Sequence, residues 1–336
     1  MRVLVVTNMY PSPNRPDYGT FVHEQVESLR QAGVNIDVIA FDARGRAGNY
    51  LKAIRDLRAL LKKKPYDLLH AHYGLTGFVC NMQTRIPVVI TFHGGDLVME
   101  ADSKHRPTLK NIFEVALSKL GALGAARCIV VSDLLKPKIW PKRAVTIPMG
   151  VDLSLFKPIP SDQARRQLNL PADKKLVAFL ANPARFVKRF DIAQAAVRQL
   201  QGDGQKVELL PIYDQPHSQI PLYLNACDVL VLTSMKEASP VAIKEAMACN
   251  LPLVSTRVGD VAERIEGVAG CYLSEPDPAD VAAKLRLGLE FGQRTNGREK
   301  IQSLSLENVA HRVIEVYQEM LPNHSIASRK YQARGL

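Results

Sequence analysis

Short apolar runs alternate with longer segments of helical periodicity along this chain. The short runs are rich in valine, isoleucine and leucine, as expected for strands that are buried on both faces of a parallel sheet. The predicted strands are residues 3–7, 34–41, 67–71, 87–92, 128–132 and 144–148 in the first half, and residues 176–180, 207–211, 229–233, 253–256 and 271–273 in the second. Helical spacing in segments such as 21–31, 50–64 and 109–120 places helices between the strands. The pattern predicts an α/β protein built from repeated strand–helix units.

The alternation is interrupted once, near the middle of the chain. A proline-rich stretch with Pro158, Pro160 and Pro171 reads as a linker, and a length of 336 residues suits two domains. We predict a domain over residues 1–157, a second over 158–305 and a final helix over 306–322 that ties them together. Ligands are expected at the carboxyl ends of the strands of such sheets.

Composition places the chain among globular proteins and narrows its class only a little. Hydrophobic residues make up 46% and charged residues 23%, far from the composition of disordered chains. No run approaches the ~18 to 20 apolar residues that span a bilayer, and the N-terminal apolar run is too short for a signal peptide. We therefore expect a soluble or peripheral cytoplasmic protein.

The chain is strongly basic and contains five cysteines. A formal charge of +11 suits nucleic acid, an acidic membrane surface or a phosphorylated substrate, and charge alone does not choose among them. The five dispersed cysteines show no paired spacing, so we interpret them as reduced core thiols and predict no metal site.

Residues 233–248 combine a strand end, a turn and the start of a helix. Ser239 and Pro240 mark that start, because proline is tolerated early in a helix where its missing N–H costs nothing. The free N–H groups of a helix start form an anion site suited to a diphosphate. Glu237 and Glu245 can accept hydrogen bonds from sugar and ribose hydroxyls. On spacing alone, ordinary solvated acids beside a helix are the simpler interpretation.

The residues around these glutamates favour the functional interpretation. Glu237 and Glu245 are separated by seven residues and are followed by Ala-Met-Ala at 246–248, then Pro252, Gly259 and Glu263. This window resembles the E-x(7)-E donor site of the family 4 glycosyltransferases. The resemblance implies the GT-B fold, in which two Rossmann-like domains face each other across a cleft. It also implies transfer from a nucleoside diphosphate sugar, of UDP or GDP type, with retention of anomeric configuration and without a metal or other cofactor.

A basic segment after the first strand of the second domain resembles the family's diphosphate-binding pair. Arg185 and Lys188 occupy the matching positions, and Arg189 is a rival for the arginine because the spacing is shorter than usual. Cationic side chains there would neutralise charge on the leaving nucleotide. Two departures stand out in the glutamate window: Asn250 replaces a common glycine, and Asp260 replaces a second glycine near the donor sugar.

The first domain supplies further candidates. The loop containing Gly19 resembles the family's glycine loop near the donor phosphates, although a single glycine also suits a simple turn. His93 and Asp96, in the segment His-Gly-Gly-Asp, resemble the family's H-G-x-D motif. The resemblance implies that His93 contacts a donor hydroxyl and that Asp96 faces donor or acceptor.

The resulting hypothesis is a hexosyltransferase of polysaccharide or glycolipid synthesis. The leaving phosphate would help to deprotonate the acceptor while Glu237 and His93 orient the sugar. The basic amphipathic helix at 50–64 fits an anionic inner membrane surface and a lipid-linked acceptor, or equally an ordinary solvated helix.

Two rival functions remain open at this point. A nucleotide-sugar epimerase would use the same two-domain scaffold without an acceptor. A basic nucleic-acid-binding protein would explain the charge, but no helix-turn-helix, zinc finger or aromatic-rich basic sheet is evident, so no nucleic acid partner is expected.

Overall fold

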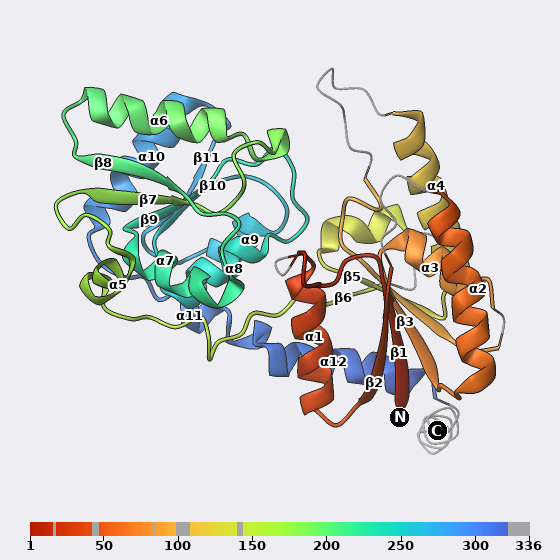
Figure 1. Ribbon diagram of the computed structural model, residues 1–336. Helices are drawn as coiled ribbons and strands as arrows, with labels where there is room; N and C mark the ends of the chain where they lie inside the picture. The colour runs from red at the N-terminus through yellow and green to blue at the C-terminus, as the bar shows by residue number, and fades with distance from the viewer. Residues whose placement is uncertain (16–17, 42–46, 84, 99–107, 140–143, 322–336) are drawn as a thin grey trace, which may run out of the picture. The chain divides into compact units, whose positions relative to one another are not determined.

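The computed structural model describes residues 1–15, 18–41, 47–83, 85–98, 108–139 and 144–321. The chain divides into two compact units, one formed by Met1–Met149 with the segment that begins at Leu306, and the other by Gly150–Ser305 (Figure 1). The predicted boundary after residue 157 therefore lies too late. Val151 and Phe156 are buried in the core of the second unit, and this packing moves the boundary toward the N-terminus.

The first unit contains a six-stranded parallel sheet in the order β2-β1-β3-β4-β5-β6. The chain runs outward from β1 to β2 and then returns to the other side of β1 with β3, so the strand order reverses between β1 and β3. Ligands of doubly wound sheets bind at the carboxyl ends of the strands at such a reversal. Its main elements are β1 (Arg2–Thr7), α1 (Thr20–Gln31), β2 (Asn35–Ala40), α2 (Ala47–Lys63), β3 (Leu68–His72), α3 (Gly74–Asn81), β4 (Val88–Phe92), α4 (Leu109–Gly124), β5 (Arg127–Val130), η1 (Asp133–Lys138), β6 (Ala144–Thr146) and α12 (Leu306–Glu319).

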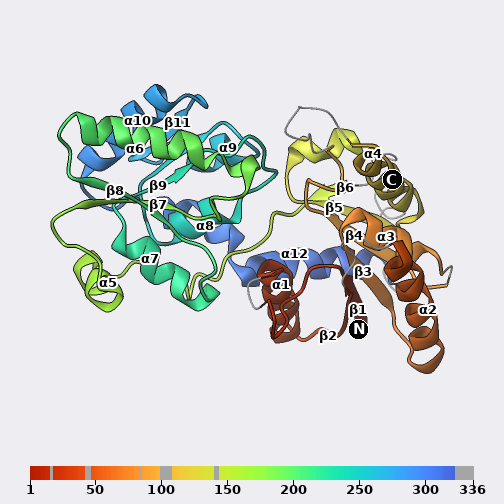
Figure 2. The same cartoon turned by 45° about the horizontal axis from the view of Figure 1, so that its top comes forward.

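The last helix, α12, is an integral part of the first unit. Its apolar face, which includes Val309, Val313 and Val316, is buried in one core with strand residues such as Val3 and Val5. Figure 2 shows α12 beside α1, and the two helices are in contact. The helix predicted from apolar spacing is confirmed, while its role in joining the two units stays a prediction.

The second unit contains a five-stranded parallel sheet in the order β11-β10-β9-β7-β8. Its strand order reverses between β7 and β9, so the loops after these two strands meet at the predicted ligand edge. Its elements are α5 (Ser161–Leu168), β7 (Lys175–Phe179), η2 (Phe186–Lys188), α6 (Phe190–Gly202), β8 (Val207–Pro211), η3 (His217–Gln219), α7 (Ile220–Ala226), β9 (Val229–Leu232), α8 (Val241–Ala248), β10 (Leu253–Thr256), α9 (Val261–Ile265), β11 (Cys271–Ser274), α10 (Pro278–Phe291), α11 (Gly297–Lys300) and η4 (Gln302–Leu304).

All eleven predicted strands are present, and α8 is the element whose start differs most instructively. Pro240 is its N-cap, with an extended ψ of 123°, so the first helical residue is Val241. Ser239 does not cap the helix, because its hydroxyl donates to the carboxylate of Asp260 at 2.9 Å. The first free N–H groups of the helix therefore belong to Val241 and the residues that follow it.

Candidate functional site

Lys188 and Glu237 meet at the carboxyl edge of the second sheet, where the strand order reverses. Lys188 ends η2 in the loop after β7, and Glu237 lies in the loop after β9. The Lys188 Nζ donates to Glu237 Oε1 at 2.5 Å, and the two side chains are 17% and 18% exposed. The pair is thus largely shielded from water but still reachable by a ligand.

Hydrogen bonds to backbone carbonyls join the two loops that carry this pair. Thr233 Oγ1 donates to the carbonyl oxygens of Lys188 and Arg189 at 3.0 and 2.8 Å. The N–H of Met235 donates to the carbonyl of Val187 at 2.9 Å. These bonds fix the distance between the two loops, so the Lys188–Glu237 pair does not depend on two independent flexible segments.

The start of α8 lies directly after the Glu237 turn. No side chain among the described residues caps this helix, so the first N–H groups, from Val241 onward, lack a side-chain acceptor. Unsatisfied N–H groups at a helix start attract anions. A small hollow beside them, with room for about one water molecule, is lined in part by Lys188, Ser234 and Ala242.

The buried Ser234 hydroxyl also belongs to this hollow. Its oxygen has no hydrogen-bond partner within the described residues, and a buried hydroxyl without a partner costs free energy. A polar ligand atom or a water molecule would remove that cost. The sequence carried one signal for this residue, its place directly after a strand on the predicted ligand edge.

Glu245, the second glutamate of the motif, is buried within α8. Its Oε1 lies 2.9 Å from Nε2 of His217, which is on η3 after β8. The His217 ring also packs against Phe156, with ring centroids 5.2 Å apart. A carboxylate has further acceptor positions, so this contact leaves Glu245 able to accept from a ribose. Sequence reasoning missed His217, because no motif pairs it with Glu245.

The basic residues after β7 have different surroundings. Arg185 is exposed at the N-cap of η2. Arg189 occupies the left-handed region at φ 50° and its guanidinium is held by Asp191, with the closest contact at 2.8 Å. The rival arginine is therefore already engaged in a local ion pair, and Arg185 is the more available of the two. Both assignments to a diphosphate stay predictions.

The two departures noted in the glutamate window have clear local explanations. Asn250 has φ 53° and follows α8, so it takes the left-handed conformation in which asparagine replaces glycine at low cost. Asp260 is buried and is bonded to Ser239 and to Arg264. Its carboxylate is thus committed within the protein, whereas the sequence had raised an effect on the loop near the donor sugar.

Gly19 of the first unit is required by its backbone geometry. It has φ 78° at the N-cap of α1, and a Cβ there would lie 2.5 Å from the carbonyl carbon of Met9. Any larger residue would push the loop after β1 away from the start of α1. This contact explains the glycine by packing, and the approach to donor phosphates stays a prediction.

His93 lies at the carboxyl end of β4 in a cluster of rings. Its centroid is 5.2 Å from that of Phe21, 4.6 Å from Tyr73 and 5.3 Å from His72. Its Nε2 is 3.1 Å from Nδ1 of His72, so the two rings share one proton between these nitrogens. The contact with Phe21 brings His93 and the Gly19 loop to the same edge of the first sheet.

Two further histidines on β3 support His93, and sequence reasoning missed both. His70 lies between Tyr317 Oη, 2.5 Å from Nδ1, and Thr91 Oγ1, 2.8 Å from Nε2. Burial lowers the pKa of His70 to about 3 and that of His72 well below its ordinary value, so both rings are neutral at physiological pH. The signal was the alternation His-Ala-His within a strand that is buried on both faces.

Asp96 ties the loop after β4 to the start of α3. Its carboxylate accepts N–H bonds from Gly94 at 2.8 Å, from Gly74 at 3.1 Å and from His93 at 3.2 Å. Burial raises the pKa of Asp96 to about 6, against the opposing effect of these bonds, so the group is ionised at neutral pH. Its contact with donor or acceptor stays a prediction.

Tyr73, the residue between β3 and α3, has an unusual backbone. It has φ 76° and ψ 144°, a region that is nearly confined to glycine. The backbone carries this strain at the residue whose partly buried ring contacts His93. Non-glycine residues in such conformations cluster at functional sites, which supports this edge of the first sheet as functional.

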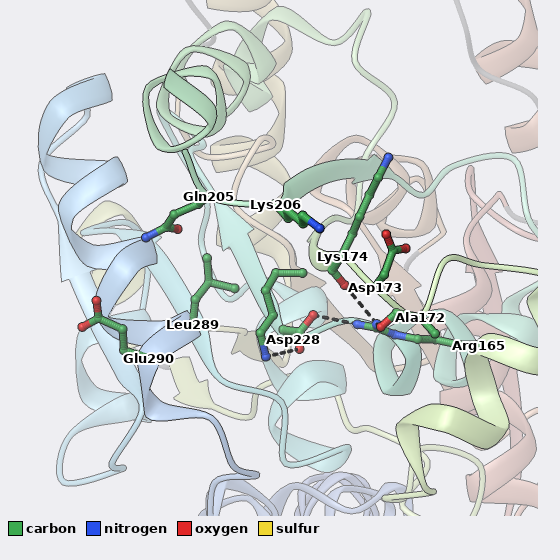
Figure 3. Close-up of a pocket in the computed structure, with 10 residues that line it drawn as sticks. Arg165, Ala172, Asp173, Lys174, Gln205, Lys206, Asp228, Leu289 and Glu290 are labelled. Carbon is green, nitrogen blue, oxygen red and sulfur yellow. Dashed lines mark hydrogen bonds and ion pairs between the residues drawn. The ribbon is translucent and has the colours of Figure 1, made fainter. Parts of the chain in front are cut away.

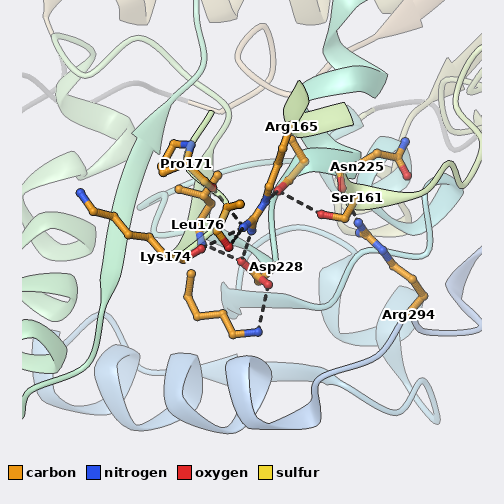
Figure 4. A network of polar contacts seen from close by, with 11 residues as sticks. Ser161, Arg165, Pro171, Lys174, Leu176, Asn225, Asp228 and Arg294 are labelled. Carbon is orange, nitrogen blue, oxygen red and sulfur yellow. Dashed lines mark hydrogen bonds and ion pairs between the residues drawn. The ribbon is translucent and has the colours of Figure 1, made fainter. Parts of the chain in front are cut away.

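A larger hollow of the second unit lies at the opposite, amino edge of the sheet (Figure 3). It has a volume of about 360 Å³ and is lined by residues that include Arg165, Lys174, Lys206 and Asp228. Figure 4 shows that the Arg165 guanidinium is surrounded by acceptors from its own unit. Arg165 donates to Asp228 at 2.7 Å and to the carbonyls of Ala226 and Lys174 at 2.8 and 3.0 Å. This edge is a structural network.

In the part of the chain that the structure describes, no group of three or more histidine, cysteine or acidic side chains is arranged to hold a metal ion. The five cysteines are free, and burial raises the pKa of each thiol. None of its helices is both long and apolar enough to pass through a bilayer.

Comparison with known proteins agrees with this geometry. The model described as Glycosyltransferase Family 4 matches residues 18–155, and the one described as Glycosyl transferases group 1 matches residues 181–290. Among curated proteins, the chain is 25% identical to TuaC of Bacillus subtilis (strain 168), which is described as a candidate teichuronic acid biosynthesis glycosyltransferase. That match covers 78% of this chain and 82% of TuaC.

Solved structures establish the fold. A sucrose-phosphate synthase from Thermosynechococcus elongatus matches with a TM-score of 0.77 and 20% identity over 95% of this chain and 99% of that one. Anabaena HepE in complex with UDP-glucose matches with a TM-score of 0.68 and 19% identity over 94% and 99% of the two chains. Together with the two family matches, these findings confirm the predicted fold and show that the chain belongs to the family 4 glycosyltransferases of GT-B fold.

Proposed function

We propose that this protein transfers a hexose from a nucleoside diphosphate sugar to a carbohydrate or lipid-linked acceptor, with retention of configuration and without a metal ion. The observation that carries the proposal is the Lys188–Glu237 pair beside the uncapped start of α8, at the point where the strand order of the second sheet reverses. A cation, free helix N–H groups and an acceptor for hydroxyls there match the parts of a nucleotide sugar.

Lys188 can serve the diphosphate without releasing Glu237. An ammonium group has three N–H donors, and Glu237 takes one of them at 2.5 Å. A diphosphate oxygen would accept another while the first N–H groups of α8 face the same anion. This arrangement supplies the positive charge that a metal would otherwise provide for the leaving group.

The proposed reaction is a substitution on one face of the sugar. The bond between the anomeric carbon and the diphosphate oxygen breaks, and a bond from the acceptor oxygen to that carbon forms. The proton of the acceptor hydroxyl passes to an oxygen of the leaving diphosphate. Glu237 holds the sugar through its hydroxyls, Glu245 accepts from the ribose, and Arg185 adds charge at the diphosphate. In the first unit, His93 contacts a donor hydroxyl and Asp96 fixes its loop.

The donor and pathway are proposed from similarity and chemistry together. The matching HepE structure is a complex with UDP-glucose. We therefore propose a UDP- or GDP-linked hexose as the donor of this protein. The name of TuaC refers to teichuronic acid biosynthesis, which supports a role in cell-surface polysaccharide synthesis for this chain. No cofactor beyond the co-substrate is part of the proposal.

A cytoplasmic site at the inner membrane face is a further part of the proposed function. Helix α4 exposes large apolar side chains, among them Phe113 at 64% and Leu109 at 86%. Helix α2 exposes basic side chains, and both helices pack against α3 (Figure 1). Apolar side chains beside basic ones suit an anionic leaflet. The exposed set is Leu109, Ile112, Phe113, Leu120 and Leu123 on α4, with Lys52, Arg55, Arg58, Lys62 and Lys63 on α2.

Vesicle flotation tests the membrane proposal. We expect the protein to float with vesicles that contain anionic lipid and to sediment with neutral ones. The double variant Phe113→Glu/Leu120→Glu should lose flotation, whereas Leu287→Glu, which changes an exposed leucine of the second unit, should keep it. Equal binding to neutral and anionic vesicles, or no binding at all, would reject the proposal and leave α2 as an ordinary solvated helix.

A thermal-shift screen with UDP, GDP and their sugars tests the donor. A ligand that binds the native state raises its stability by mass action, so one of the two nucleotide series should raise Tm, and EDTA should leave the shift unchanged. A shift that requires added divalent metal would contradict metal independence. Failure of both series, combined with salt-sensitive binding to DNA, would instead favour a nucleic-acid-binding protein.

Product analysis separates transfer from epimerisation. A transferase releases the nucleoside diphosphate only when an acceptor is present, and the anomeric configuration of its product is the same as that of the donor. An epimerase converts the donor sugar without an acceptor. Inversion at the anomeric carbon would refute the retaining mechanism while leaving transfer intact.

A further inference from the structure

A buried lysine lies next to the proposed donor site and takes no part in the proposed transfer reaction. Lys244 is on α8, directly before Glu245, and is 1% exposed. A buried ammonium group is costly unless it is paired and hydrogen-bonded. Its surroundings therefore need an explanation.

Lys244 is joined to the Gly259 loop through Ser239. Its Nζ donates to Ser239 Oγ at 3.3 Å, and Ser239 Oγ donates to Asp260 Oδ2 at 2.9 Å. Asp260 is 4% exposed and also accepts from Arg264 Nε at 2.9 Å. The three residues Lys244, Ser239 and Asp260, named here the buried link, connect α8 to the start of α9.

The buried link acts on the same turn that carries Glu237. Ser239 lies two residues after Glu237, and Gly259 packs under that turn with φ 54°. A Cβ on Gly259 would lie 2.5 Å from the carbonyl oxygen of Ala238 and 3.2 Å from that of Glu237. From the other side, Thr256 Oγ1 donates to the carbonyl of Ser234 at 2.8 Å. The turn is thus held at its start by Thr256 and at its end by Asp260.

We propose, on the basis of the donor site proposed above, that the buried link positions the Glu237 turn for the nucleotide sugar, with Lys244 and Asp260 as positioning residues that do not touch the donor. Ser239 is fixed by a donor on one side and an acceptor on the other, so its main chain, the entry to α8, has one orientation. The first N–H groups of α8 and the carboxylate of Glu237 then keep a fixed separation. The carboxylate of Asp260 is occupied by its hydrogen bonds within this link and does not contact the sugar.

Buried charged groups that are joined through a hydroxyl favour a positioning role over a stabilising one. Two charges lose their hydration when they are buried, and their attraction often only balances that loss. An apolar residue of similar size at position 244 would fill the same space on α8 without that penalty. What Lys244 and Asp260 add is direction, because their hydrogen bonds restrict the orientation of Ser239 and apolar packing does not.

Calorimetric titration of the full chain with UDP and GDP tests the proposal, using whichever nucleotide binds the unaltered protein. Lys244→Met removes the ammonium and keeps most of the volume, while Asp260 retains Arg264 and Ser239 as partners. We expect about tenfold weaker nucleotide binding, measured well below the Tm of the variant. Lys175→Met, which removes a lysine paired with Asp228 at the opposite edge of the same sheet, should leave the Kd unchanged.

A purely structural lysine predicts a different result. In that case Lys244→Met would lower Tm and leave the Kd of the folded protein and the KM for the donor at their original values, and the proposal would be overturned. If neither nucleotide binds the unaltered protein, the donor site itself fails. If binding is normal and only Lys188→Ala weakens it, the donor site stands and the buried link does not.

The pH dependence of binding gives a second readout. Burial lowers the pKa of Lys244 to about 8, while Asp260 and Glu245 act to raise it and Arg264 to lower it. Above about pH 8 the link loses its positive charge, so nucleotide binding should weaken between pH 7.5 and 9 in the unaltered protein. In Lys244→Met the affinity should be constant over that range. An identical decline in both proteins would contradict the proposal.

Discussion

The two edges of the second sheet both carry a basic residue paired with a carboxylate, yet they differ in what those groups are free to do. At the amino edge, Arg165 directs its guanidinium to Asp228 and to backbone carbonyls of its own unit (Figure 4). At the carboxyl edge, Lys188 donates to Glu237, and the ammonium keeps capacity for another acceptor. The first pair is committed to the fold, while the second can be shared with a ligand.

This contrast also shows why the size of a hollow does not locate the chemistry. The amino-edge hollow has a volume of about 360 Å³, and the one beside Lys188 has room for about one water molecule. The small hollow, however, contains the unpartnered hydroxyl of Ser234 and adjoins the uncapped start of α8. Donors and acceptors without a protein partner, located where the strand order reverses, are a better guide to function than the volume of a hollow.

The largest expected effect is on catalysis by the carboxyl-edge pair. Glu237→Gln keeps the size of the side chain but removes its charge, and Lys188→Ala removes the cation at the diphosphate. We expect each to lower kcat by about 100- to 1000-fold, the range typical for loss of one charge-stabilising group in an active site. Steady-state kinetics with the identified donor measures this, and full activity in Glu237→Gln would refute its assignment.

The matching change at the amino edge should affect folding and leave catalysis intact. Arg165→Met removes the guanidinium partner of the partly buried Asp228, which keeps only the exposed Lys175 and the N–H of Leu176. Removing one member of a fully buried ion pair costs roughly 3 to 5 kcal/mol. The partial exposure of Asp228 and its second partner Lys175 lower that cost, so urea denaturation should show a loss of unfolding free energy below this range. The kcat of the folded fraction should not change. A variant with unchanged stability and reduced kcat would contradict the assignment of a structural role to the amino edge and a catalytic role to the carboxyl edge.

A smaller effect is expected at Gly259, which supports the carboxyl edge from below. An alanine there would adopt an unfavourable left-handed conformation, costing about 1 to 2 kcal/mol, and its Cβ would press on the Ala238 carbonyl. We expect a modest fall in Tm and weaker nucleotide binding. Gly204→Ala, with φ 83° and open space around the glycine, is the control and should lower Tm without changing the Kd.

The smallest effect is expected from Lys206, one of the exposed lysines that line the amino-edge hollow. Lys206→Ala changes a residue that lines this hollow and lies away from the Lys188–Glu237 pair. Nucleotide affinity, kcat and Tm should all stay within experimental error. A substantial loss of nucleotide binding in Lys206→Ala would place the ligand at the wrong edge for this account.

Much of the fold could be predicted from sequence because parallel strands buried on both faces read as continuous apolar runs. All eleven strands were predicted on that basis, and the helices at α1, α2, α4 and α12 were predicted from helical spacing of apolar residues. The domain boundary was placed too late because prolines mark a linker only approximately. Residues 151–156 pack with the second unit, in a core formed by segments far apart in the sequence. Local sequence patterns do not reveal such packing.

The candidate site was predictable only where a motif named its residues. Lys188 and Glu237 were identified by resemblance, and their contact follows from the strand-order reversal. Lys244 was missed because a lysine in a helix normally reaches solvent, and its burial depends on Asp260, which lies beside it only after folding. The backbone strain at Tyr73 has no sequence signal, because most positive-φ positions are recognised through glycine.

The most direct measurement of the central claim is a structure of the full chain with the bound nucleoside diphosphate. We predict diphosphate oxygens within hydrogen-bond distance of Lys188 Nζ and of the first N–H groups of α8, with the ribose near Glu245. A nucleotide bound at the Arg165 edge, or one whose diphosphate contacts neither Lys188 nor α8, would contradict it.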